Sequence, residues 1–322
     1  MKLYFAPLEG VAGYIFRNAF VHHYGGADRY FTPFLSNPIL SHKERNDVLP
    51  ENNAASPLIP QILANNSEYF LEIAKTLKDL GYSEVNLNLG CPSGTVVSKK
   101  RGAGFLSVPD SLDTFLGEIF EKCPLKISFK TRIGMEDISE WSHLLEIFAK
   151  YPFSELIIHP RLRRELYGGS VHRDAFKTAF DYLVGKKGLG ADKLVYNGDI
   201  CSAEDFSSLT AGFPELTKVM IGRGALKNPE IFNILHGKGE IKNPKEKLDT
   251  FYAYHDELFD SYRNIMYGEK PVLFKMKELW GWFSEYAGLD AKELKSIRKA
   301  SSFTTYTSTR RQFQTQAISD LR

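Results

Sequence analysis

The sequence predicts an α/β fold, a (β/α)8 TIM barrel, followed by a small C-terminal all-helical domain. Eight short runs of β-branched and aromatic residues recur before residue 223, and amphipathic stretches separate most of them. Strands that alternate with helices pair in parallel, and eight such units favour a closed barrel over an open doubly wound sheet. From about residue 241 only helical periodicity continues. We therefore expect a barrel at 1–240 and a helical domain at 241–322.

The individual elements follow from the period of the apolar residues. Strands are expected at 3–7, 29–34, 58–63, 84–90, 126–132, 155–160, 193–199 and 218–222. Apolar residues three and four positions apart predict helices at 67–80, 111–122, 138–150 and 173–184, with only a short helix in 36–46. Beyond the barrel, helices are expected at 245–263, 270–286 and 291–300, and the segment 301–309 is polar and rich in hydroxyl groups.

Composition narrows the class of protein. Of the 322 residues, 43% are hydrophobic, which is enough for a large core. No run approaches the roughly 18 apolar residues of a membrane span, and the N-terminus lacks a signal-peptide pattern, so we expect a cytoplasmic protein without a membrane partner. Cys91, Cys123 and Cys201 are too widely spaced for a disulfide framework or a metal-ligand pair, and we predict no metal. The net charge of +2 does not by itself indicate nucleic acid, and no protein partner is evident.

Cys91 is the first candidate catalyst. Val85, Leu87 and Leu89 alternate with polar residues, and the strand stops where Pro92 cannot continue its hydrogen-bond ladder. Cys91 thus stands at the carboxyl end of a predicted strand, where barrel enzymes place their working groups. The alternative is a small buried hydrophobe, as most free cysteines are.

Polar residues also stand at the carboxyl ends of the other predicted strands. Gln61, Lys130 and His159 could hydrogen-bond a flat polar heterocycle, although a histidine with satisfied hydrogen bonds in the core is the alternative for His159. The last two strands end in glycine-containing turns before helices, a common phosphate-binding arrangement in barrels. Arg223 could add a charge-assisted contact there, or belong to a surface ion pair.

Seven motifs, in order, resemble those of the flavin-dependent tRNA-dihydrouridine synthases of bacterial type, and the resemblance spans the chain. They are APLEG at 6–10, NLGCP at 88–92, KRGAGFL at 100–106, KTRIG at 130–134, HPR at 159–161, NGDI at 197–200 and GRGA at 222–225. Leu8 replaces the usual methionine of the first motif, and Pro160 is a variant within the fifth.

The resemblance implies an FMN at the barrel mouth, reduced by NADPH, that passes a hydride to C6 of a uracil ring while Cys91 donates a proton to C5. A thiol suits this role because its reference pKa of about 8.5 keeps it protonated near neutral pH. Asn88 would contact the uracil or the flavin edge, and Arg132 the flavin, the substrate or Asp199. The implied cofactor-binding residues are Pro7, Leu8, Glu9, Gln61, Lys130, His159, Asn197, Gly198, Asp199, Gly222 and Arg223.

The helical region is the expected tRNA-binding surface. From residue 283 to residue 322 there are seven Lys or Arg against four Asp or Glu, a net charge of 7 − 4 = +3. Phosphate contacts of this kind make binding salt-dependent. An ordinary charged cap over the barrel is the alternative. The candidate phosphate binders are Lys295, Arg298, Lys299, Arg310 and Arg311, supported by the aromatic residues Tyr306 and Phe313.

Two other functions fit these residues in part. FMN-dependent dihydroorotate or dihydropyrimidine dehydrogenases also place a cysteine opposite a flavin in a barrel, but a free pyrimidine gives the helical region no purpose. A non-catalytic flavin-containing RNA-binding barrel is disfavoured because Cys91, Lys130 and His159 are all intact.

Overall fold

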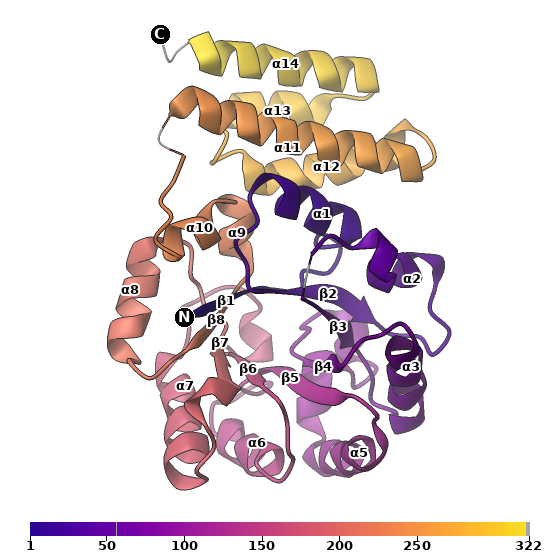
Figure 1. Cartoon of the computed structure of the whole chain (residues 1–322), viewed down its shortest axis with the longest axis vertical. Coiled ribbons are helices and arrows are strands. Elements are labelled where there is room, and N and C mark those ends of the chain that lie inside the picture. Colours follow the sequence, from indigo (N-terminus) through magenta and orange to yellow (C-terminus); the bar gives the residue numbers. More distant parts are fainter. Residues whose placement is uncertain (56, 242, 320–322) are drawn as a thin grey trace.

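The computed structural model describes residues 1–55, 57–241 and 243–319, and it contains a closed barrel of eight parallel strands in sequence order (Figure 1). Strand β1 pairs with both β2 and β8, which closes the barrel. This architecture confirms the predicted fold. The strands are β1 (Lys2–Phe5), β2 (Arg29–Leu35), β3 (Leu58–Ile62), β4 (Glu84–Leu89), β5 (Lys126–Arg132), β6 (Leu156–His159), β7 (Leu194–Tyr196) and β8 (Lys218–Ile221).

The register of the strands brings polar residues together inside the barrel. Asn88 of β4 is the partner of Lys130 of β5, and Arg132 is the partner of His159 of β6. Partners in parallel strands point to the same side of the sheet, as do residues two positions apart on one strand. The four side chains therefore lie on the same face of the sheet, the inner one, near the end of the barrel where the strands finish.

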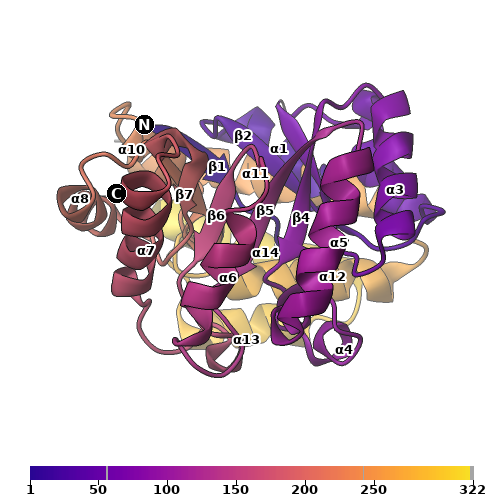
Figure 2. The same ribbon diagram turned by 90° about the horizontal axis from the view of Figure 1, so that it is seen from below.

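Helices cover the outer face of the barrel. Viewed from below, α3, α5, α6 and α7 stand along the strands (Figure 2). Short 3-10 turns occur at Pro50–Asn52, Gly102–Ser107, Arg163–Glu165 and Ala191–Lys193. The helices of this region are α1 (Tyr14–His23), α2 (His42–Val48), α3 (Ser67–Asp79), α4 (Gly94–Val97), α5 (Pro109–Lys122), α6 (Glu140–Phe148), α7 (Arg173–Phe180), α8 (Ala203–Gly212), α9 (Arg223–Lys227) and α10 (Ile231–Leu235).

Several predicted elements of the barrel were too long, including one helix and one strand near its end. The helix expected at 173–184 ends as an α-helix at Phe180 and continues as a π-helical turn over Asp181–Lys186, which contains Gly185. The strand expected at 193–199 stops at Tyr196. The Asn197 N–H still donates to the Ile158 carbonyl of β6 (2.9 Å), while its side-chain amide donates to the carbonyl of Met220 on β8 (2.9 Å).

Four helices follow the barrel and lie over α1 on one side of it (Figure 1). They are α11 (Pro244–Ile265), α12 (Glu269–Phe283), α13 (Ala291–Lys299) and α14 (Phe303–Ser319). The first three confirm the predicted helices, whereas α14 was not predicted. Its hydroxyl-rich start caps the helix, since Ser302 Oγ accepts from the Thr305 N–H at 3.2 Å. Residues 242 and 320–322, at the edges of the predicted domain 241–322, lie outside the described residues.

The buried residues of the helical region form one continuous hydrophobic core with those that surround the barrel strands. The Tyr306 hydroxyl is hydrogen-bonded to His255 Nε2 (2.6 Å) and accepts from Trp280 Nε1 (2.7 Å), which links α14, α11 and α12. Lys275 of α12 donates to the carbonyl of Gly10, in the loop that follows β1. No helix in the described part of the chain is both long and apolar enough to cross a membrane.

Candidate active site

One cavity opens at the end of the barrel where the strands finish, and residues from all eight strand ends line it. All the predicted cofactor residues line this cavity, together with Cys91, Asn88 and Arg132. The barrel therefore brings the residues of six separate motifs to one place. The lining residues are Ala6, Pro7, Leu8, Glu9, Pro33, Phe34, Gln61, Asn88, Gly90, Cys91, Pro92, Lys130, Arg132, His159, Tyr167, Asn197, Gly198, Asp199, Ile200, Cys201, Gly222, Arg223 and Gly224.

A chain of buried amides fixes the loop that carries Cys91. Asn88 Oδ1 accepts from the N–H groups of Gly90 (3.0 Å) and Cys91 (2.9 Å). Asn88 Nδ2 donates to Gln61 Oε1 (2.7 Å), and Gln61 Nε2 donates to Asn86 Oδ1 (2.8 Å). Each of the two side chains keeps one amide N–H for a ligand. Asn88 therefore positions the thiol as well as lining the cavity.

The glycines of the third motif pack behind the same loop. Gly102 has a φ of +56°, and a Cβ there would lie 2.9 Å from the carbonyl oxygen of Cys91. The neighbouring Ala103 N–H donates to that carbonyl at 3.1 Å. A larger residue at Gly102 would therefore displace Cys91, which explains why glycine stands at this position.

Burial keeps the Cys91 thiol protonated. Burial raises the pKa of Cys91 above its usual value of 9.0, and the Glu9 carboxylate raises it further. The Ser93 N–H, Arg132 and Lys130 act in the opposite direction, and the pKa still ends above the usual value. The thiol is thus the form present near neutral pH, and it can act as a proton donor.

Two basic groups that line the cavity have lowered pKa values. Burial lowers the pKa of Lys130 from 10.5 to about 7, and the Arg132 guanidinium lowers it further. Burial also lowers the pKa of His159 well below 6.5, helped by Arg132, Lys130, Arg161 and Arg223. No carboxylate appears among the groups that shift the pKa of Lys130. A half-buried amine without an anionic partner is costly, so the site fits a ligand that offers electron-rich oxygen or nitrogen atoms.

Arg132 joins two loops. Its guanidinium donates to the carbonyls of Gly90 (3.0 Å), Leu162 (2.8 Å) and Leu166 (2.6 Å), and so connects the loop after β4 to the loop after β6. The predicted alternative of a contact with Asp199 is wrong. Asp199 pairs instead with Arg161 (2.6 Å) and Arg223 (2.5 Å).

The sequence analysis missed Tyr167. Its ring centre lies 5.4 Å from the Arg132 guanidinium, 5.0 Å from that of Arg223 and 6.2 Å from the His159 ring centre. The loop around it is held by Arg161, which donates to the carbonyls of Gly168 and Gly169. This loop has no helical or strand periodicity in its sequence. Only the position of Tyr167, directly before Gly168-Gly169 in the segment after the His-Pro-Arg motif, could have singled it out.

The predicted phosphate binders of the helical region fall into two groups. Lys295, Arg298, Lys299 and Arg311 are exposed. Arg310 is buried, pairs with Asp256 at 2.5 Å and stacks on Tyr252, so its assignment as a phosphate binder is wrong. Tyr306 and Phe313 are also buried and cannot stack on RNA, which corrects their predicted supporting role. Sequence spacing alone does not distinguish an inward-facing arginine from an outward-facing one.

A protein-family model described as "Dihydrouridine synthase (Dus)" matches residues 4–293. The chain belongs to the dihydrouridine synthase family. This confirms the predicted resemblance and the predicted class of enzyme, a flavin-dependent oxidoreductase that reduces uridine. The match continues past the barrel as far as α13, so family members share part of the helical region as well.

Curated relatives of this dihydrouridine synthase carry matching names. A "Probable tRNA-dihydrouridine synthase" of Staphylococcus epidermidis is 29% identical over 70% of this chain and 68% of the relative. One of Staphylococcus aureus is 28% identical over 87% of this chain and 82% of the relative. "Probable tRNA-dihydrouridine synthase 2" of Bacillus subtilis is 27% identical over 70% of this chain and 69% of the relative.

Solved structures support the fold of this dihydrouridine synthase. A morphinone reductase variant in complex with tetrahydroNAD aligns with a TM-score of 0.51 at 10% identity, covering 78% of this chain and 90% of the other. Another morphinone reductase structure aligns with a TM-score of 0.50 at 11% identity, covering 76% and 87%. At this identity the similarity concerns the barrel fold alone.

Proposed function

We propose that this dihydrouridine synthase reduces uridine in tRNA, with FMN as its flavin, NADPH as the reductant and Cys91 as the proton donor. The observation that carries the proposal is that Cys91, on a loop fixed by Asn88, lines the same cavity as Lys130 and His159. Burial raises the pKa of the Cys91 thiol, which favours the proton-donating form. The names of the relatives support tRNA as the substrate. We also propose that the enzyme works in the cytoplasm.

The residues present fit a flavin in two parts. Lys130 and His159 would donate to its ring carbonyls and nitrogens, and Gln61 has one amide N–H left for the same purpose. The backbone of Gly198 and Gly222 and the Arg223 guanidinium would hold the phosphate, while Asp199 orients Arg223.

The reduction adds two hydrogens across the C5–C6 bond of uracil. Reduced by NADPH, the bound flavin would supply the hydride for C6. Cys91 would donate its thiol proton to C5, and solvent would then reprotonate the thiolate. Asn88 holds the loop of Cys91 through two backbone N–H groups, so the donor keeps one position while the uracil ring enters.

We propose that residues 241–322 form a domain that binds the tRNA backbone. Its exposed basic residues are Lys295, Arg298, Lys299 and Arg311. A base must leave its stack to reach the cavity, which costs about a few kcal/mol. Ion pairs with phosphates would offset this cost and would weaken as the salt concentration rises.

Nucleoside mass spectrometry tests the function directly. Transfer RNA that lacks dihydrouridine is incubated with the protein, FMN and NADPH, and we expect uridine that has gained two hydrogens. Free dihydroorotate and free uracil are run in parallel. Turnover of a free pyrimidine without any reaction on tRNA would favour the dehydrogenase alternative. Bound flavin and NADPH oxidation without a product on any substrate would contradict the role of Cys91.

A further inference from the structure

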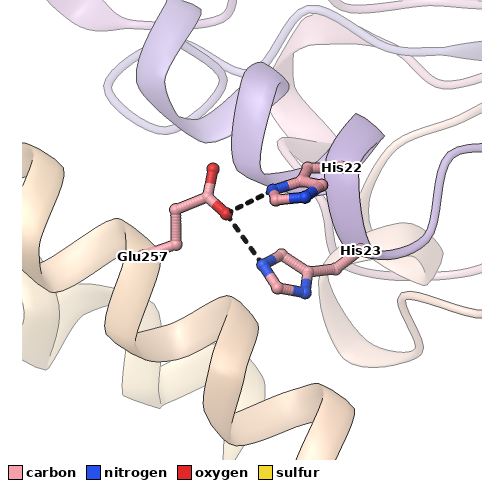
Figure 3. A group of neighbouring side chains, drawn as sticks. All are labelled: His22, His23 and Glu257. Atoms are coloured by element: carbon pink, nitrogen blue, oxygen red, sulfur yellow. Dashed lines mark hydrogen bonds and ion pairs between the residues drawn. The ribbon is translucent and has the colours of Figure 1, made fainter.

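Two histidines and a glutamate converge at the junction of the barrel and the helical region (Figure 3). His22 and His23 end α1, and Glu257 lies in α11. One oxygen of Glu257, Oε2, contacts both His22 Nδ1 (2.7 Å) and His23 Nε2 (2.8 Å). Among the described residues this is the one group of three His, Cys, Asp or Glu side chains whose ligand atoms all lie within 4.8 Å of one another.

The convergence of the two imidazoles is unusual for their position. Consecutive residues of a helix point about 100° apart around its axis. The rings of His22 and His23 nevertheless lie 4.8 Å apart between centres, and they present different nitrogens, Nδ1 and Nε2, to one carboxylate oxygen. The side chains thus form a three-atom cluster from two parts of the molecule.

The chemistry of this cluster matches that of a metal site. An ionised carboxylate only accepts hydrogen bonds, so in the metal-free protein both facing nitrogens must carry a proton. A neutral imidazole can carry its single proton on the other ring nitrogen, which leaves a lone pair facing the carboxylate. We propose that His22, His23 and Glu257 bind one divalent transition-metal ion of the zinc class and thereby link α1 to α11. Imidazole nitrogen and carboxylate oxygen are ligands that suit such ions.

The two distances from Glu257 Oε2 to the histidine nitrogens need to change only a little for a zinc ion to fit. Zinc–nitrogen and zinc–oxygen bonds of about 2.0–2.2 Å in a tetrahedron place neighbouring ligand atoms about 3.3–3.5 Å apart. The present contacts of 2.7 and 2.8 Å must therefore open by only about 0.5–0.8 Å. The His22 side chain is 73% exposed, which leaves access for the ion and room for water as a fourth ligand. His23 is 15% exposed and its ring packs edge-on against Tyr254, which keeps it in place.

This site is separate from the flavin cavity, since none of its three residues lines that cavity. The proposal therefore does not depend on the proposed reaction, and its tests need no turnover. It was hidden from the sequence because Glu257 lies 234 and 235 positions away from the two histidines.

Calorimetric titration of zinc chloride into the full-length, flavin-loaded protein is the first test, after chelator treatment and in a buffer that does not bind zinc. We expect one zinc per chain, and a roughly tenfold or greater loss of affinity in each of His22→Ala, His23→Ala and Glu257→Gln. His143→Ala is the matched control, because its ring faces a single carboxylate, Glu146, at 3.8 Å. This control should bind zinc as the unchanged protein does.

A second measurement identifies the ligands. The extended X-ray absorption fine structure at the zinc edge should show two imidazole ligands in the loaded protein, and one of them should be lost in His23→Ala. Glu257→Gln keeps a hydrogen-bond acceptor, so it provides the test if a histidine variant fails to fold. Absence of zinc binding in the unchanged protein, or binding that none of the three substitutions weakens, would overturn the proposal.

Discussion

The two ends of the barrel bury charged groups in opposite ways. Where the strands begin, Glu155 pairs with Lys218 (2.7 Å) and Arg29 (3.4 Å) and accepts from the Tyr4 hydroxyl (2.9 Å). Where the strands finish, the half-buried Lys130 lines the cavity with Arg132 and His159, and its pKa is lowered by burial and by Arg132. One end satisfies its charges within the protein, and the other leaves donors for a ligand. A basic group without an acidic partner therefore distinguishes the functional end of the barrel better than burial does.

The largest effect is expected from removing the thiol at the functional end. Cys91→Ala should lower the rate of uridine reduction by about 10² to 10⁴, the usual contribution of a positioned acid. Flavin binding and NADPH oxidation should persist, because they do not need this proton. Rapid-mixing measurement of flavin reoxidation by tRNA checks this. Cys123→Ala, outside the cavity, is the control and should react normally.

Opposite stability effects are expected from charge removal at the two ends. Glu155→Ala leaves the Lys218 amine, whose side chain is 13% exposed, without its partner, while Arg29 keeps its ion pair with Glu84 (3.3 Å). The substitution should lower the free energy of unfolding by about 3 kcal/mol. Lys130→Met removes a half-buried amine that has no anionic partner, so the flavin-free protein should be equally or more stable while its affinity for flavin falls. Urea unfolding and flavin fluorescence titration measure the two quantities. Equal destabilisation by both substitutions would remove the contrast between the ends.

The same amine predicts a pH dependence of stability. The pKa of Lys130 is about 7 in the folded protein and 10.5 in its ordinary state. The unfolded chain therefore binds more protons between these values, and the free energy of unfolding should rise with pH across this window. The destabilisation is fully present below pH 7, where both states are protonated. Urea unfolding of the flavin-free protein from pH 7 to pH 10 should show the rise, and Lys130→Met should have a smaller slope than the unchanged protein.

A smaller effect should follow from loosening the Cys91 loop. Asn88→Ala removes the acceptor of two backbone N–H groups and should slow uridine reduction by roughly tenfold, about 1.4 kcal/mol. Asn88→Asp keeps the acceptor and should restore part of the rate. The single-turnover rate with saturating tRNA separates this effect from weaker binding. If Asn88→Asp and Asn88→Ala are equally slow, the role of Asn88 lies in ligand contact instead.

Much of the fold could be predicted because strand and helix periods are local properties. The candidate active site followed from the rule that strand ends meet at one face, which brought Gln61, Lys130 and His159 together as expected. Helix α14 was missed because its first residues are mostly polar. The buried residues Tyr306 and Phe313 alone give too weak an apolar period to predict a helix. The error at Arg310 has a related cause, since its partner Asp256 lies 54 positions away. Partner choice over such distances is a property of packing, which no local pattern contains.

The contact between Lys275 and the Gly10 carbonyl constrains any chimera in which the helical region of this enzyme is exchanged. Gly10 has a φ of +77°, and it directly follows Glu9, which lines the cavity. The helical region thus holds a loop of the catalytic cavity through a lysine of its own, although it supplies none of the residues that line that cavity. A chimera that exchanges this region for that of a relative must therefore carry a donor at the position of Lys275. Without it, the exchange would alter the entrance of the catalytic cavity as well as the proposed tRNA-binding surface.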